Sequence, residues 1–167
     1  MASKRTPAAN MALGGILAAL AVVIMSLGTI IPVATYTCPV LCALVLEMVR
    51  KRCGNRIAWA WYGAVALLSL LLAPDKEAAA VFAFLGYYPI LKPWMDRRRG
   101  SWLWKAALFN GMTLLMYWLL MHLFGMDQII AEFSEMGAVM TAVLLVLGNV
   151  TFFMLDRLLG MRFVRRR

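Results

Sequence analysis

The stretch AANMALGGILAAL, residues 8–20, is apolar enough to enter a membrane, yet it consists largely of alanine and glycine. On a helix, residues three and four apart share a face. Four small residues of this stretch fall in one such stripe: Ala8, Ala12, Gly15 and Ala19. Small residues at this spacing let a second helix approach closely, which favours helix association in lipid. The stripe either packs within this chain or docks a separate subunit, and its pattern leaves both interpretations open.

The composition places the rest of the chain in the same class. Of 167 residues, 63% are hydrophobic and 15% are charged, and the mean hydropathy is +0.79. A soluble domain is about half apolar and about a quarter charged. We therefore expect a single polytopic membrane domain over residues 1–167. Its first apolar run is longer than a signal-peptide core and reads as a retained helix.

Six apolar segments have about the length that crosses the hydrocarbon core as a helix. They are residues 8–31, 36–51, 57–73, 77–95, 102–124 and 137–160. Cations gather at every second connector, whereas acidic residues gather in the others. Because short basic loops are retained in the cytoplasm, this pattern predicts an all-α integral membrane protein with six transmembrane helices and both termini cytoplasmic. Topology and anionic headgroups account for the net charge of +9, so we expect no nucleic-acid partner.

Motifs for catalysis or metal binding are missing from the sequence. Cys38 and Cys42 share one helix face, and the single histidine, His122, lies in another segment. We therefore expect packing thiols, with no metal site and no cofactor. Because no HExxH, GxSxG, P-loop or EF-hand pattern is present, we do not expect an enzyme.

Charged residues near the ends of two segments suggest local ion pairs. Glu47 precedes Arg50 and Lys51 by three and four residues, a spacing that brings side chains together on a helix. Asp156 and Arg157, near the end of the last segment, are interpreted in the same way.

Two asparagines lie deeper in the predicted membrane region. Asn110 and Asn149 each fall about halfway through a segment, counting about 1.5 Å per helical residue. Amides at that depth need partners, which are either each other across two helices or a bound ligand.

The stretch PDKEAAAVFAFLGYYPILKP, residues 74–93, is the least regular of the apolar segments. Asp75 looks like a helix cap, and Glu77 in the first turn suits the helix dipole. Pro89 cannot donate a bond to the Leu85 carbonyl and predicts a kink. The two tyrosines before it, residues 87–88, either stack on a flat ligand or pack.

A six-span protein of this size, with Ala-x-x-x-Ala in its first helix, resembles the substrate-binding S-components of energy-coupling factor (ECF) vitamin importers. The match falls on AANMALGGILAALAVV, residues 8–23. In that family the alanine motif meets coupling helices of the transmembrane T-component. The resemblance implies a subunit that binds a small, vitamin-like molecule in a bacterial-type cell membrane and is energised by T-component and ATPase subunits. The residues implied in docking are Ala8, Ala12, Gly15 and Ala19.

The resemblance also implies a substrate site near the outer face. A lid would be IPVATYTCP, residues 31–39, in which Pro32 and Pro39 prevent a regular helix and Tyr36 caps the pocket. The loop GMDQIIAEFSEMG, residues 125–137, would be a second lid. The implied wall residues are Lys76, Glu77, Tyr87, Tyr88, Asn110, Tyr117, His122 and Asn149. In this scheme Lys76 meets an anionic group, the tyrosines stack, and Glu77 or the asparagines make polar contacts.

Two other classes of function remain open. A membrane scaffold, an assembly subunit or a self-associating helical bundle would use the same small-residue stripe and would need no pocket. A lipid-processing membrane enzyme would require paired catalytic groups, which the sequence does not display.

Overall fold

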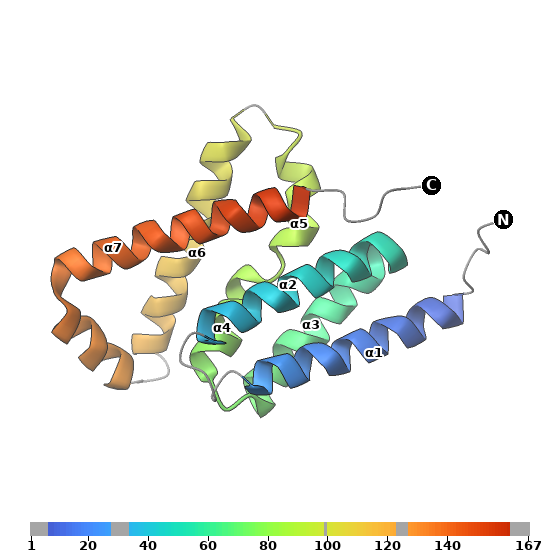
Figure 1. Cartoon of the computed structure of the whole chain (residues 1–167), viewed down its shortest axis with the longest axis horizontal. Coiled ribbons are helices and arrows are strands. Elements are labelled where there is room, and N and C mark those ends of the chain that lie inside the picture. The colour runs from blue at the N-terminus through green and yellow to red at the C-terminus, as the bar shows by residue number, and fades with distance from the viewer. Residues whose placement is uncertain (1–6, 28–33, 99, 123–126, 161–167) are drawn as a thin grey trace. The chain divides into compact units, whose positions relative to one another are not determined.

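The computed structural model describes residues 7–27, 34–98, 100–122 and 127–160, and these residues form helices and no strand (Figure 1). The helices are α1 (Pro7–Ser26), α2 (Ala34–Cys53), α3 (Asn55–Leu72), α4 (Lys76–Leu85), α5 (Tyr88–Met95), α6 (Ser101–His122) and α7 (Asp127–Gly160). The all-α prediction is confirmed for these ranges. The chain divides into two compact units, Met1–Trp94 and Met95–Arg167.

Among the described residues, three helices are long and apolar enough to cross a membrane: Ala8–Ser26, Asn55–Leu72 and Ala142–Gly160. They coincide with the first, third and sixth predicted segments. Their surfaces carry large exposed apolar side chains, including Ile16, Leu71 and Met154, which are 68%, 68% and 62% exposed. Soluble monomers rarely present extended apolar surface of this kind, so the three helices favour a membrane protein.

The first unit is built around α2. Helices α1 and α4 both pack against α2 and α3. Gly54, with φ 91°, is the single residue between α2 and α3, and α3 runs back alongside α2 after it (Figure 1). The core consists of apolar side chains from all four helices: Ala21, Met25, Cys42, Leu46, Val49, Trp61, Val65, Ala78 and Phe82. Cys38 and Cys42 are both buried, so the predicted packing role of these thiols is confirmed.

Part of the predicted first lid belongs to helix α2. Residues 34–39 are the first turns of α2, and Pro39 lies inside the helix, so the prediction that Pro39 prevents a regular helix is wrong. A proline in the second turn loses one backbone bond, to the Thr35 carbonyl, and the following fourteen residues continue the helix. The remaining lid residues, 31–33, lie outside the described residues.

The predicted segment 77–95 is two helices rather than one. Helix α4 ends at Leu85, and α5 begins at Tyr88. Pro89 therefore lies in the first turn of α5, where amide groups have no partner inside the helix and a missing N–H costs little. The chain breaks before the proline instead of bending at it. The predicted cap at Asp75 is confirmed, since its Oδ1 accepts a bond of 2.9 Å from the Ala78 amide.

The break between α4 and α5 has two further supports. The Ala83 carbonyl, near the end of α4, accepts a hydrogen bond from the Tyr62 hydroxyl of α3. Gly86 lies so close to the preceding turn that a Cβ atom there would be 2.6 Å from Cδ2 of Phe82. The position consequently requires glycine for space rather than for an unusual φ.

In the second unit, α6 and α7 pack against each other. The rings of Phe109 and Phe152 stack between them, with centroids 4.8 Å apart and planes 22° apart. Helix α7 begins at Asp127, ten residues before the predicted segment, so the predicted second lid is helical from that residue onward. Figure 1 shows the first turns of α7 running in a different direction from the rest of the helix. Residues 125–126 lie outside the described part.

Candidate functional site

The residues predicted to bind substrate are divided between the two units. Tyr36, Lys76, Glu77, Tyr87 and Tyr88 belong to the first unit, together with the α1 stripe. Asn110, Tyr117, His122 and Asn149 belong to the second. Each unit thus contributes its own set of polar contacts.

The first set lies where the N-termini of α2 and α4 meet. The Tyr36 hydroxyl donates to Oε1 of Glu77 at 3.0 Å. Beside it, Oγ1 of Thr35 donates to Oδ2 of Asp75 at 2.8 Å. Tyr36 from the predicted lid and Glu77 from the predicted wall are thereby brought together, although 41 residues separate them. Two hydroxyls and two carboxylates give this end of the unit the means to form hydrogen bonds or to hold a cation.

Lys76 turns away from that pair. Its ammonium donates to the carbonyls of Leu70 at 2.9 Å and Leu71 at 3.4 Å, near the end of α3. A cation suits a helix C-terminus, where carbonyl groups lack helical partners. Its predicted contact with an anionic ligand would require the side chain to leave these carbonyls, and it stays a prediction.

The two tyrosines at the α4–α5 break differ in their surroundings. Tyr88 is 1% exposed and belongs to the packed interior. Tyr87 is half-buried and meets Tyr62 edge-on, with ring centroids 5.9 Å apart and planes 76° apart. Its buried hydroxyl has no hydrogen-bond partner among the described residues. Of this pair, Tyr87 is the one with a polar atom left to satisfy.

The small-residue stripe of α1 faces outward. Ala8, Ala12, Gly15 and Ala19 are all exposed, and a Cβ atom added to Gly15 would meet nothing within 4 Å. The neighbouring side of α1 is buried instead, where a Cβ atom on Gly14 would lie 3.7 Å from Ile57. Close packing inside the chain therefore uses the Gly14 side. The predicted stripe has no helix against it in the part of the chain that the structure describes.

The second set is centred on Asn110 of α6 and Asn149 of α7. Nδ2 of Asn110 donates to Oδ1 of Asn149 at 3.0 Å, and Nδ2 of Asn149 donates back at 2.9 Å. Each amide also donates to the carbonyl four residues earlier, that of Ala106 or Leu145. Of the two interpretations that the sequence leaves open, mutual pairing is the one observed.

The other two predicted residues of this unit lie elsewhere on α6. Tyr117 is half-buried, and His122 is exposed at the end of the helix. The His122 ring stacks on Trp118 with centroids 5.3 Å apart, and its Nδ1 lies 3.1 Å from the Trp118 carbonyl oxygen. Because Asn110 and His122 are separated by about 18 Å of helix, they do not form one compact site.

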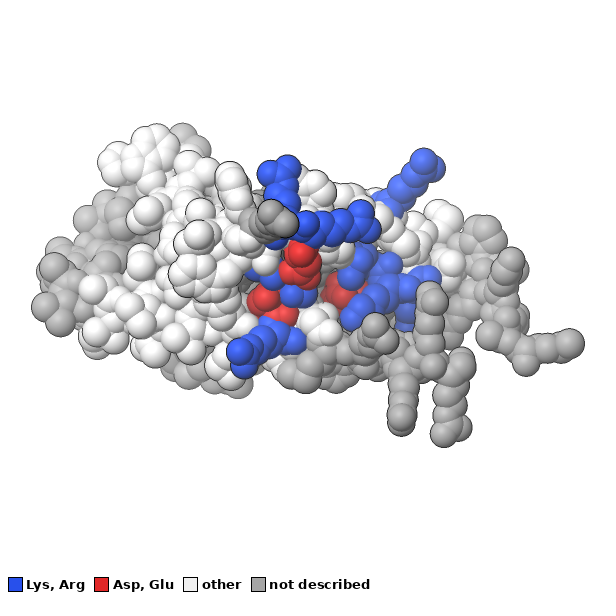
Figure 2. All heavy atoms as spheres, turned by 90° about the horizontal axis from the view of Figure 1, so that it is seen from above, with Lys and Arg blue, Asp and Glu red and all other residues white. Residues whose placement is uncertain are grey.

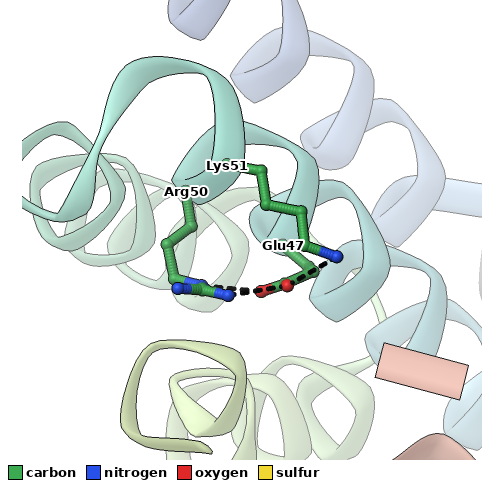
Figure 3. Close-up of polar contacts among 3 residues, drawn as sticks. All are labelled: Glu47, Arg50 and Lys51. Carbon is green, nitrogen blue, oxygen red and sulfur yellow. Dashed lines mark hydrogen bonds and ion pairs between the residues drawn. The ribbon is translucent and has the colours of Figure 1, made fainter. Parts of the chain in front are cut away.

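Two groups of ionic side chains are also found among the described residues, and the first was predicted. Glu47 accepts two bonds of 2.7 Å from the Arg50 guanidinium, and Lys51 reaches its Oε1 at 3.0 Å (Figure 3). All three residues lie in the last two turns of α2. The predicted local ion pair is confirmed, with both cations sharing one buried carboxylate.

The second group was missed. Lys105, 5% exposed, pairs with both oxygens of Asp156 at 3.0–3.1 Å and also with Asp96. Lys105 of α6 is thus a partner of Asp156 that the sequence did not indicate, and the predicted local pairing with Arg157 stays a prediction. The sequence did contain a signal for this pair. Lys105 lies near the start of one apolar segment and Asp156 near the end of the next, so the two would lie at the same depth if the segments form a helical hairpin.

Within the described residues, no three or more His, Cys, Asp and Glu side chains are grouped so that they would hold a metal ion. Comparison with protein-family models, curated proteins and solved structures finds no match to this chain. The functional argument consequently rests on the residues themselves.

Proposed function

We propose that this chain is a six-span subunit that binds a small molecule in a bacterial-type cell membrane and belongs to an importer energised by separate T-component-like and ATPase subunits. Both termini would be cytoplasmic, as the distribution of charge suggests. The substrate would bind near the outer face, where Tyr36 and Glu77 meet. The chain itself would perform no bond chemistry.

The outward-facing stripe of α1 is the observation that carries this proposal. The first apolar helix presents Ala8, Ala12, Gly15 and Ala19 on an open surface, while its other side is already packed. In lipid, such a flat surface gains little from contact with acyl chains but allows another helix to approach closely. A coupling subunit that docks on α1 would use this property.

The test is co-purification of the tagged full-length chain from its own host, followed by mass spectrometry. The wild-type chain should bring down a membrane subunit and an ATPase subunit, and a bound small molecule should be released on denaturation. Gly15→Leu should lose both subunits while retaining the small molecule, because the substitution fills the stripe and leaves the polar group at α2 and α4 unchanged.

Gly63→Leu is the matched control. Gly63 is an exposed glycine in the interior of α3, and a Cβ atom there also meets nothing within 4 Å. This variant should keep both subunits. If Gly15→Leu retains them, or if the two variants lose them equally, the proposed docking role of α1 is wrong.

A scaffold or self-associating bundle is the second candidate, and the pairing of Asn110 with Asn149 favours it. These amides satisfy each other inside the second unit, as they would in a bundle that binds no ligand. A ligand-free protein that co-purifies only with itself or with non-ATPase membrane proteins would support this alternative.

A further inference from the structure

We propose that the turn between α2 and α3 binds the headgroup of an anionic phospholipid through Arg52 and Arg56, with Trp59 as its interfacial anchor. The proposal rests on the membrane placement given above but not on the transport role. It concerns residues 50–56, called here the basic turn.

The four cations of the basic turn are not equivalent. Glu47 neutralises part of the charge, and its carboxylate is already shared by Arg50 and Lys51. Arg52 and Arg56 are exposed, and neither has an ion-pair or hydrogen-bond partner among the residues that the structure describes. Two guanidinium groups therefore remain available for an external anion.

The backbone places these two arginines on either side of a very short connection. Arg52 is in the last turn of α2, Arg56 is in the first turn of α3, and Gly54 alone separates the helices. A guanidinium group recognises phosphate oxygens through paired N–H donors, which gives it both charge and geometric fit. The basic turn thus presents two such groups within five residues.

The surroundings of the basic turn favour a lipid over other anions. Asn55–Leu72 is one of the helices apolar enough to cross a membrane, so the turn lies at the end of such a helix. Trp59, 42% exposed, lies three residues after Arg56 and is held edge-on against Tyr62. Tryptophan prefers the headgroup level of a bilayer. Further along α3, Leu67 and Leu71 are 61% and 68% exposed and provide apolar surface for acyl chains.

Charge complementarity points to an anionic headgroup. The cytoplasmic leaflet carries anionic lipids, and each Lys or Arg near it adds to the attraction. Figure 2 shows Lys and Arg side chains projecting from the molecular surface. At the basic turn the Glu47 carboxylate is paired with Arg50 and Lys51. The charge that the turn presents outward is therefore positive.

The experiment is native mass spectrometry of the full-length chain in neutral detergent, titrated with dioleoyl phosphatidylglycerol or dioleoyl phosphatidylcholine. The variants are Arg52→Gln, Arg56→Gln, and Lys51→Gln as the control. Each removes one positive charge, but Lys51 is the cation already paired with Glu47. Arg56→Lys keeps the charge, and thermal unfolding of each variant checks that it is folded.

We expect the wild type to bind phosphatidylglycerol in preference to phosphatidylcholine. Combining Arg52→Gln with Arg56→Gln should weaken phosphatidylglycerol binding about tenfold, whereas Lys51→Gln should weaken it about twofold or less. Arg56→Lys keeps the charge but loses the paired N–H donors, so its binding should fall between that of the wild type and that of Arg56→Gln. Millimolar inorganic phosphate should not displace the lipid, since the acyl chains contribute to its affinity.

Three results would overturn the lipid site: equal binding of the two lipids, equal losses from Lys51→Gln and Arg52→Gln, or full displacement by inorganic phosphate. Displacement would identify a free-phosphate site instead. If Arg52→Gln and Arg56→Gln leave lipid binding intact but lose a co-purified protein, the turn docks a protein. Extraction of the wild-type chain from membranes by alkaline carbonate would refute the membrane placement itself, independently of the headgroup.

Discussion

At the residue scale, Gly86 is the position where one added methyl group should matter most. A Cβ atom there would lie 2.6 and 2.7 Å from two ring carbons of Phe82, and Phe82 is 0% exposed. The ring is packed in the core, so making room for the methyl group requires neighbouring core side chains to shift. We expect Gly86→Ala to lower the free energy of unfolding by about 1–3 kcal/mol, measured by denaturant unfolding of the purified protein in detergent.

Gly63→Ala provides the comparison for that measurement. Gly63 is a helical glycine with open space around the added atom. Replacing it should be neutral or should stabilise the helix by about 0.5–1 kcal/mol, because alanine loses less conformational freedom than glycine on folding. Similar losses for the two variants would show that the contact with Phe82 does not constrain Gly86.

The ionic residues show that the sequence predicts ion pairs within one helix but not ion pairs between two helices. The pairing of Glu47 with Arg50 and Lys51 follows from helical spacing alone, because all three residues lie on one helix. The bond from Lys105 to Asp156 spans 51 residues and depends on how two helices align. The spacing of residues along one helix does not predict how two helices align. The sequence therefore suggested only a local partner for Asp156, its neighbour Arg157.

At the element scale, two asparagines link α6 and α7 by reciprocal hydrogen bonds. Asn110→Leu or Asn149→Leu alone should cost about 1–2 kcal/mol, because each leaves the other amide without its interhelical partner in an apolar setting. The double variant should cost less than the sum of the two, since no unpaired amide remains. Unfolding free energies of the four proteins in one detergent give the coupling directly.

Thr151→Val is the control for that cycle. Its hydroxyl bonds the Leu147 carbonyl within α7, so it contributes no bond between the helices. It should therefore show no coupling to Asn110→Leu. Strict additivity of the two asparagine losses would contradict the idea that their reciprocal bonds hold α6 and α7 together.

A helix boundary could be predicted from the sequence where a capping side chain specifies it. Asp75 caps α4 as its position suggests, and Pro89 lies in the first turn of α5, where a proline is tolerated. Pro39 does not interrupt α2, because a proline in the second turn costs a single bond, which a twenty-residue helix tolerates. The early start of α7 was missed because the amphipathic stretch before residue 137 reads as a loop when only apolar runs are sought.

At the scale of the whole molecule, the number of membrane crossings depends on elements that are less regular than α1, α3 and α7. Helices α4 and α5 have 10 and 8 residues, so neither alone reaches the roughly 30 Å of the hydrocarbon core at about 1.5 Å per residue. Together with the two residues between them they extend to about 30 Å if they lie end to end. Burial of the break beside Tyr62 and Phe82 would then shield its backbone from lipid. Six spans therefore require that α4 and α5 cross as one unit.

Cysteine labelling of the full-length chain tests that requirement. With the native cysteines replaced by alanine, Pro74→Cys and Arg98→Cys place one thiol at an exposed position on each side of α4 and α5. An impermeant maleimide should label Pro74→Cys in intact cells and Arg98→Cys only after permeabilisation, because the basic connector is expected to stay inside. Labelling of both residues from outside would mean that α4 and α5 return to the same face. The second unit would then have the opposite orientation, and the wall that six spans assign to Asn110 and Asn149 would be lost.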